Sequence, residues 1–173
     1  MAVIIHESGM KFGEYEENQV FQLENSRQYT KTLSPHGVKS CEFILCRNDK
    51  LYFVEAKTSC PRHITATTPE EKTAKYNEYI HDIVLKMQHS LALYANILLE
   101  RYTSDGVPDL LKKKDLSDLE IILLLVVKNA ENEWLAPFQD VFRTKLRNEL
   151  RIWKIRAFNI INETTARNKG FII

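Results

Sequence analysis

The chain has 173 residues, of which 44% are hydrophobic and 27% are charged. This composition is typical of one compact domain with a sizeable core, and no low-complexity stretch suggests disorder. The longest apolar run, IILLLVV at 121–127, is too short to cross a bilayer, and the first residues lack the basic start and long apolar centre of a signal peptide. We therefore expect a single domain over residues 1–173, located in the cytoplasm and without a membrane partner.

Charge is distributed unevenly along the chain, although the formal net charge is only +1. Residues 7–24 contain five glutamates and one lysine, whereas residues 143–156 contain six lysines and arginines and one glutamate. An acidic beginning could supply metal ligands, and a basic end could supply a surface that faces phosphates. Two ordinary solvated faces are the alternative interpretation.

The first half of the chain predicts strands followed by a long helix. QVFQLE at 19–24 alternates like a strand, and NSRQYTKTL at 25–33 is typical of a short helix before the turn SPHG. Two strands are expected within residues 41–59. A long helix follows, with Thr68 as its cap, Pro69 at its first position and Glu71 completing a capping box, and its apolar stripe continues to about Tyr102.

The second half alternates strands and helices. After a polar turn at Lys112 to Lys114, EIILLLVV at 120–127 predicts a central strand covered on both faces. A helix is expected from about Pro137 to Leu150, then a strand in RIWKIRAF at 151–158, then a short helix from Asn162 that stops at Gly170. This order predicts an α/β fold with a mixed β-sheet flanked by helices.

Three charged residues interrupt the apolar strands of CEFILCRNDKLYFVEAKTS at 41–59. A two-residue turn at Asn48 and Asp49 would place Glu42 opposite Glu55 on the neighbouring strand. Because side chains alternate along a strand, Glu55 and Lys57 share a face, and Glu42 lies on that same face. The sequence therefore predicts that the three charges converge at one end of the hairpin.

Two carboxylates directly opposite each other repel, and the apolar residues around them make that repulsion costlier. A divalent cation would resolve it, because carboxylate oxygens are ligands that Mg²⁺ and Mn²⁺ prefer. Lys57 could then orient the attacking water and stabilise negative charge in the transition state. The alternative is that Lys57 bridges Glu42 and Glu55 as a buried structural ion pair.

CEFIL, followed after a turn by LYFVEAKTS, resembles the hairpin of the PD-(D/E)xK nuclease superfamily, which has the restriction-endonuclease-like fold. The resemblance implies that Glu42 and Glu55 bind a divalent metal and that Lys57 is the catalytic lysine. It also implies a further acidic ligand near the start of the chain, for which Glu24 is the first candidate and Glu17 the second. The expected cofactor is Mg²⁺ or Mn²⁺.

We therefore expect a metal-dependent nuclease that hydrolyses DNA phosphodiester bonds, and we expect an endonuclease in preference to an exonuclease. Arg151, Lys154 and Arg156, in the basic end of the chain, are the expected nucleic-acid contacts. One alternative is a non-catalytic domain of the same fold that binds protein or nucleic acid. Another is a small subunit that acts only in an oligomer such as a homodimer.

Overall fold

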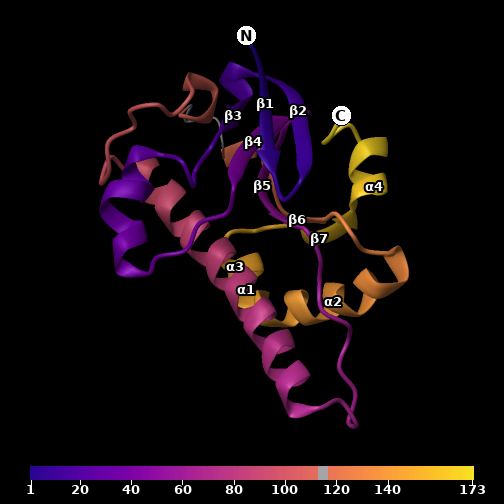
Figure 1. The fold of residues 1–173 in the computed structure, drawn as a ribbon. Helices are drawn as coiled ribbons and strands as arrows, with labels where there is room; N and C mark the ends of the chain where they lie inside the picture. Colours follow the sequence, from indigo (N-terminus) through magenta and orange to yellow (C-terminus); the bar gives the residue numbers. More distant parts are fainter. Residues whose placement is uncertain (113–116) are drawn as a thin grey trace.

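The computed structural model describes residues 1–112 and 117–173, which form a small and a large β-sheet with helices packed around them (Figure 1). The small sheet is the hairpin of β1 and β2, and the large sheet has the order β3-β4-β5-β6-β7. The strands are β1 (Ala2–Glu7), β2 (Met10–Glu16), β3 (Val20–Phe21), β4 (Phe43–Arg47), β5 (Lys50–Lys57), β6 (Glu120–Val127) and β7 (Ala157–Asn162). The helices are α1 (Glu70–Leu98), α2 (Asn132–Lys145), α3 (Arg147–Ile152) and α4 (Glu163–Asn168).

The large sheet is mixed. β3, β4 and β5 are antiparallel neighbours, whereas β5, β6 and β7 run parallel. Parallel neighbours need a crossover, and α1 and α2 provide the two that this sheet requires. The predicted α/β fold with a mixed sheet and flanking helices is confirmed, as is the interior position of the strand at 120–127.

Each face of the large sheet has its own apolar core, because side chains alternate along the strands. Phe53 of β5 points into the core shared with α1 and α2, where its ring packs edge-on against Tyr94 of α1 at 5.7 Å. Val54 points to the other face, where it packs with Phe12 of the β1–β2 hairpin and with Phe171 near the C-terminus. The odd-numbered residues of β5 therefore face α1, and Glu55 and Lys57 belong to that set.

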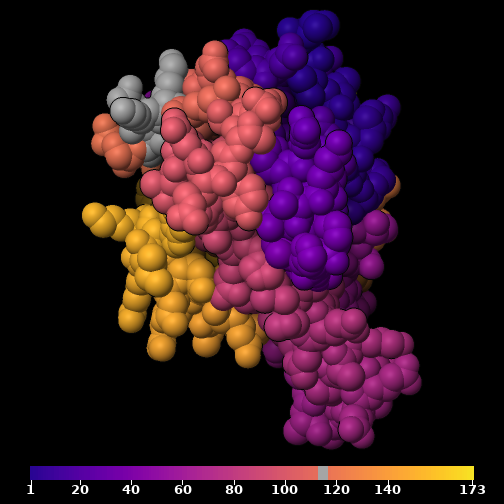
Figure 2. Space-filling model, turned by 90° about the vertical axis from the view of Figure 1, so that its left-hand side faces the viewer, coloured from indigo at the N-terminus to yellow at the C-terminus, as the bar shows by residue number. Residues whose placement is uncertain are grey.

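Helix α1 is longer than the sheet that it covers. Its 29 residues extend about 44 Å, while the eight residues of β5 span about 23 Å. The start of α1 and the loop at 58–69 consequently project beyond the body of the molecule, at the lower right of Figure 2. The middle of α1 lies against the end of β5, and this is where the predicted charged residues are found.

The N-terminal predictions were partly wrong. β1 and β2 were not expected, and only Val20–Phe21 of the predicted strand at 19–24 is in a ladder. The segment at 25–33 contains a π-helical turn, Tyr29–Leu33, in place of a regular helix. The capping box before α1 is absent, because Pro69 is the N-cap residue and the Thr68 hydroxyl instead accepts a hydrogen bond from the Thr65 N–H.

The C-terminal predictions differ from the structure at one strand. Helix α3 ends at Ile152 and β7 begins only at Ala157, so most of the predicted strand at 151–158 is helix and turn. The helix expected from Pro137 begins earlier, at Asn132, and divides into α2 and α3. The cap at Asn162 is confirmed, since its side chain accepts from the Thr165 N–H at 2.9 Å.

No helix in residues 1–112 and 117–173 is long and apolar enough to cross a membrane. The three cysteines, Cys41, Cys46 and Cys60, are free thiols. The polar turn predicted at Lys112 to Lys114 extends into residues outside the described part of the chain.

Candidate metal and catalytic site

The β4–β5 hairpin has the predicted register. Asn48 and Asp49 both have positive φ angles, 51° and 56°, as a tight two-residue turn requires, and Cys46 pairs with Leu51. The ladder stops one residue earlier than predicted, at Phe43, so Glu42 lies just outside it with its N–H bonded to the Val54 carbonyl at 3.0 Å. Glu42 thus is not a ladder partner of Glu55, although its carboxylate lies on the same side of the sheet.

Helix α1 adds a residue that the sequence did not identify. The Lys86 ammonium lies 2.8 Å from Glu55 Oε1 and 3.7 Å from Glu42 Oε1. The bridge between the two glutamates was considered for Lys57, and the structure assigns it to Lys86 instead. Lys86 contacts both carboxylates because it projects from the middle of α1 onto the end of β5.

Lys57 has a different pair of partners. Its Nζ lies 3.2 Å from Glu55 Oε1 and 3.2 Å from Asp82 Oδ2, one helical turn before Lys86 on α1. The second oxygen of Asp82 lies 3.2 Å from Lys39 Nζ. Burial would raise the pKa of Asp82, but Lys57 and Lys39 outweigh it and hold that pKa below its ordinary value.

Glu55 is fully buried, yet only half of its carboxylate is paired. Its Oε1 receives both Lys86 and Lys57, whereas its Oε2 has no hydrogen-bond partner. Burial raises the pKa of Glu55, and the two lysines oppose that shift. A buried carboxylate oxygen without a partner is costly, so this atom is a strong candidate for a ligand to a cation.

Two further glutamates lie beside this pair. The Glu24 N–H bonds to the Glu42 carbonyl at 3.4 Å, and the two side chains interact. Glu7, at the end of β1, is close enough to Glu24 and Lys86 for their charges to act on its pKa, which burial raises. The first candidate for the further acidic residue, Glu24, therefore lies at the site. Glu17 does not, since its exposed carboxylate faces the N-terminal amine at 3.9 Å.

Glu42 holds its proton unusually strongly. Burial, a hydrogen bond with Glu24 and the charge of Glu55 together raise the pKa of Glu42 to about 9, against the opposing effect of Lys86. Burial would lower the pKa of Lys86, but the surrounding glutamates outweigh it and hold that pKa above its ordinary value. The site is thus short of positive charge, because carboxyl groups outnumber the ammonium groups that reach them.

Hydrogen bonds between distant segments fix this geometry. The Cys41 N–H donates to the Ser90 hydroxyl at 2.8 Å, and the Lys39 N–H donates to His89 Nδ1 at 3.0 Å, so α1 holds the segment that carries Glu42. On the other side of the sheet, the Ser8 hydroxyl donates to the Ala56 carbonyl at 3.0 Å. This bond places the turn of the β1–β2 hairpin over the end of β5.

The donor set suits a hard divalent cation. No group of three His, Cys, Asp or Glu side chains within the described ranges is already arranged to hold a metal ion. Glu42 and Glu55 nevertheless offer two carboxylates on one side of the sheet, with Oε2 of Glu55 unpaired. Mg²⁺ and Mn²⁺ accept one or two protein carboxylates, with waters and substrate phosphate completing the coordination. The residues therefore fit such an ion, with Lys86 as the competing cation.

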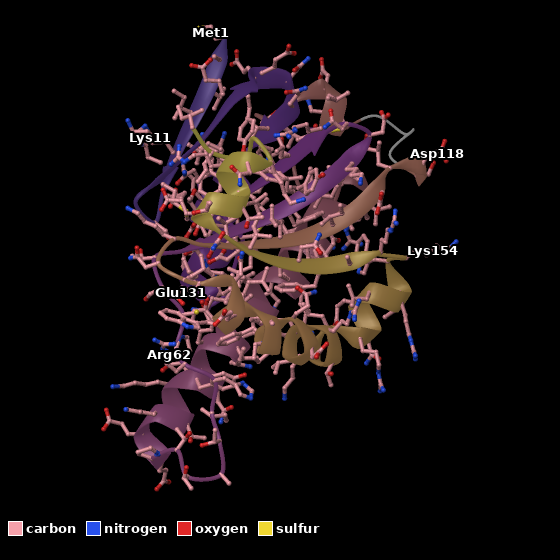
Figure 3. The ribbon with its side chains drawn as sticks, turned by 90° about the vertical axis from the view of Figure 1, so that its right-hand side faces the viewer. Met1, Lys11, Arg62, Asp118, Glu131 and Lys154 are labelled. Atoms are coloured by element: carbon pink, nitrogen blue, oxygen red, sulfur yellow. The ribbon has the colours of Figure 1, made fainter. Side chains whose placement is uncertain are left out.

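Of the three predicted nucleic-acid contacts, Arg156 lies at the end of the large sheet away from this site. Arg156 is paired with Glu120 at the start of β6, at 3.3 Å, whereas Glu55 and Lys57 are at the other end of the neighbouring strand. Figure 3 shows Lys154 on the same side of the molecule as Asp118, which precedes β6, and on the opposite side from Glu131, which follows β6. Arg151 lines a surface hollow of about 520 Å³ with Arg143 and Arg147. The length of β5 separates Arg156, beside Glu120, from Lys57 by about 23 Å. Arg151 lies on α3, which contacts α1 through a hydrogen bond from Gln88 to Glu149 at 2.7 Å.

No protein-family model matches the chain, and no curated protein or solved structure matches it either.

Asp82 and Lys86 are the site residues that sequence reasoning missed. They are four residues apart on α1, which places both side chains on one face of the helix. That face borders the buried stripe of Ile83 and Met87, so the sequence could have indicated that Asp82 and Lys86 lie near the sheet. This indication was weak, because α1 carries many other charged residues at similar spacings.

Proposed function

We propose that the chain is a metal-dependent nuclease that hydrolyses DNA phosphodiester bonds, as the resemblance to the PD-(D/E)xK superfamily implies. The observation that carries the proposal is the pair of carboxylates, Glu42 and Glu55, on one side of the sheet, with a buried oxygen of Glu55 left unpaired beside Lys57. A purely structural ion pair has no use for that unpaired oxygen.

Each residue has a role that its position supports. Glu42 and Glu55 would hold Mg²⁺ or Mn²⁺, with Glu24 as the neighbouring third carboxylate; when bound, the ion polarises the phosphoryl oxygen and supplies an acidic water. Lys57, more exposed than Glu55 and fixed by Asp82, is placed to orient the attacking water and to stabilise the charge that develops on the phosphoryl group. Water attacks phosphorus and loses a proton to solvent, the bond to the leaving sugar oxygen breaks, and that oxygen takes up a proton from solvent.

The proposal also covers the location, the mode of cleavage and the oligomeric state of the protein. The chain would act in the cytoplasm on DNA, more as an endonuclease than as an exonuclease, either alone or as a homodimer. Arg151, Lys154 and Arg156 would bind DNA phosphates.

The test combines a calorimetric Mn²⁺ titration with a plasmid-cleavage assay on the wild type and Glu55→Gln. The wild type should bind Mn²⁺ and cleave, and Glu55→Gln should lose both. Asp49→Asn is the matched control, because Asp49 is an exposed carboxylate at the opposite end of the same hairpin. A wild type that binds no Mn²⁺ at millimolar concentration would remove the basis of the proposal.

The second candidate is a non-catalytic domain of the same fold that binds protein or nucleic acid. The ion pair of Lys86 with Glu55 at 2.8 Å favours it, because that contact partly neutralises the buried charge without any metal. The plasmid-cleavage assay separates the two candidates, since a non-catalytic domain would cleave neither with nor without Mn²⁺.

A further inference from the structure

Lys86 occupies the position in the site that is most suited to a cation. Its ammonium contacts a carboxylate oxygen of Glu55 and lies within 3.7 Å of one of Glu42, and its side chain is only 12% exposed. Lys57, in contrast, is 27% exposed and is shared between Glu55 and Asp82. Lys86 is thus the only one of these two lysines that bridges the candidate metal ligands.

We propose that Lys86 is a resident counter-cation of the site, and that a divalent ion binds Glu42 and Glu55 only by displacing the Lys86 ammonium. This inference rests on the proposed function, because it concerns the metal site of that nuclease. It assigns regulation to the site, since the chain carries its own competitor for the metal.

Charge balance is the reason for the exchange. Without metal, Glu55 is buried and needs a positive partner, which Lys86 provides. With metal bound, the Lys86 ammonium at the same oxygens would repel the ion, because a lysine carries a positive charge at neutral pH. One of the two cations must therefore leave.

The side chain of Lys86 can move while α1 stays in place. A lysine has a flexible four-carbon stem and a compact charge, so its ammonium can shift without a change in the backbone. Glu24 and Glu7 both interact electrostatically with Lys86 in the present arrangement. Glu7 lies outside the carboxylates assigned to the metal, and it offers the displaced ammonium a new partner.

The first measurement is Mn²⁺ affinity by calorimetry in the wild type, Lys86→Met and Lys57→Met. When Lys86 occupies the site, only the remaining fraction of molecules can bind metal, and the apparent affinity falls in proportion to that fraction. Lys86→Met should therefore bind Mn²⁺ at least about tenfold more tightly than the wild type. Lys57→Met removes the same charge from the same glutamate without removing a bridge, and its affinity should rise by less than about threefold. Equal increases in both variants would overturn the inference, because general charge repulsion would then suffice.

The second measurement needs no variant, and it decides the question if Lys86→Met does not fold. Lysines of the wild type are reductively methylated with and without Mn²⁺, and the product is analysed by peptide mass spectrometry. Displacement should increase the labelling of Lys86 several-fold when Mn²⁺ binds, while Lys75, which is 70% exposed in its side chain, serves as the internal reference. Bound Mn²⁺ with unchanged Lys86 labelling would overturn the inference.

The outcomes distinguish the inference from the function on which it rests. If the wild type and Lys86→Met bind Mn²⁺ with equal affinity, the displacement is wrong and the nuclease proposal stands. If neither binds Mn²⁺ at millimolar concentration, both are wrong. If only Lys86→Met binds, competition between Lys86 and the ion is supported, and the nuclease proposal is wrong because the wild type takes up no metal.

Discussion

Asp82 Oδ2 lies 3.2 Å from Lys57 Nζ, and this contact joins the middle of α1 to the last residue of β5. Lys57 is therefore held between two carboxylates, those of Asp82 and Glu55. The same arrangement leaves Glu42 and the second oxygen of Glu55 for another cation. Asp82 thus holds Lys57 of β5 at one oxygen of Glu55, while Lys86 of α1 is the lysine that contacts both Glu42 and Glu55.

Asp82→Asn should slow DNA cleavage about five- to tenfold, because Lys57 loses one of two charged hydrogen-bond partners at a partly exposed position. Asp82 acts through Lys57, so the decisive measurement is a double-mutant cycle of single-turnover rates. In a Lys57→Ala background, Asp82→Asn should have no further effect. A full additional loss in that background would show that Asp82 acts on folding or on another group.

Lys57→Ala should lower the cleavage rate by about 10² to 10³, which is the usual cost of removing one electrostatic stabiliser of a transition state. Mn²⁺ affinity should stay the same or rise slightly, because an ammonium is no metal ligand and its charge opposes the ion. Plasmid cleavage and calorimetry on the same preparation measure the two effects. A Lys57→Ala protein that cleaves as fast as the wild type would make the assigned role wrong.

The hairpin was predictable because its information is local. Two turn residues, Asn48 and Asp49, and the period of two along each strand determine which side chains share a face, and the register follows from them. The same alternation placed Glu55 and Lys57 together. The fold class followed from the order of strands and helices.

The remaining parts depend on contacts between distant segments. Lys86 reaches Glu55 across 31 residues, and Ser90 reaches Cys41 across 49. No local pattern specifies which turn of a 29-residue helix will lie against the end of a strand. The strand predicted at 151–158 was wrong because its alternating side chains also suit the end of a helix followed by a turn. Tertiary packing stabilises that arrangement, in which α3 ends at Ile152 and β7 begins at Ala157.

Mn²⁺ affinity should depend on pH through Glu42. Because the pKa of Glu42 is raised to about 9, the metal-free protein keeps a proton there at neutral pH, and metal binding must release it. The apparent affinity should rise about tenfold per pH unit between pH 6.5 and about pH 8.5 if one proton leaves. Calorimetry in buffers of different ionisation enthalpy measures both the slope and the proton released.

The stability of the metal-free protein should show the opposite trend. A folded-state pKa above the unfolded value means that the native state binds the proton more strongly, so this contribution is complete below about pH 4.5 and is lost as the pH rises through about 9. Glu42→Gln, which resembles the protonated form, should lose both pH dependences. If Glu42→Gln keeps the wild-type slope, another group titrates in this range.

Ser90→Ala should destabilise the protein by about 1–3 kcal/mol, because it leaves the Cys41 N–H buried without a partner. Urea denaturation measures this free energy of unfolding. His89→Ala is the matched control: it removes the neighbouring bond to the Lys39 N–H, which is exposed to solvent, and should cost less than about 1 kcal/mol. Equal costs for the two variants would contradict the role of burial.

The combined replacement of Arg151, Lys154 and Arg156 by Ala tests the proposed phosphate contacts. Each lost contact should lower the slope of log affinity against log salt by about one unit. Arg156 is already paired with Glu120, so its contribution should be the smallest of the three. Because about 23 Å separates Arg156 from Lys57, a duplex would have to extend about seven base pairs beyond the cleaved bond to reach Arg156.

The control removes equal charge from elsewhere on the surface, by the combined replacement of Lys31, Lys72 and Lys75 with Ala. These three lysines are exposed and lie outside the basic region at 143–156. Filter binding of a long duplex, measured over a range of salt concentrations, should give a smaller slope for the first triple variant and a nearly unchanged slope for the control. Equal losses in both would show that the protein senses only overall charge, and an unchanged slope in the first variant would remove Arg151, Lys154 and Arg156 from the nucleic-acid interface.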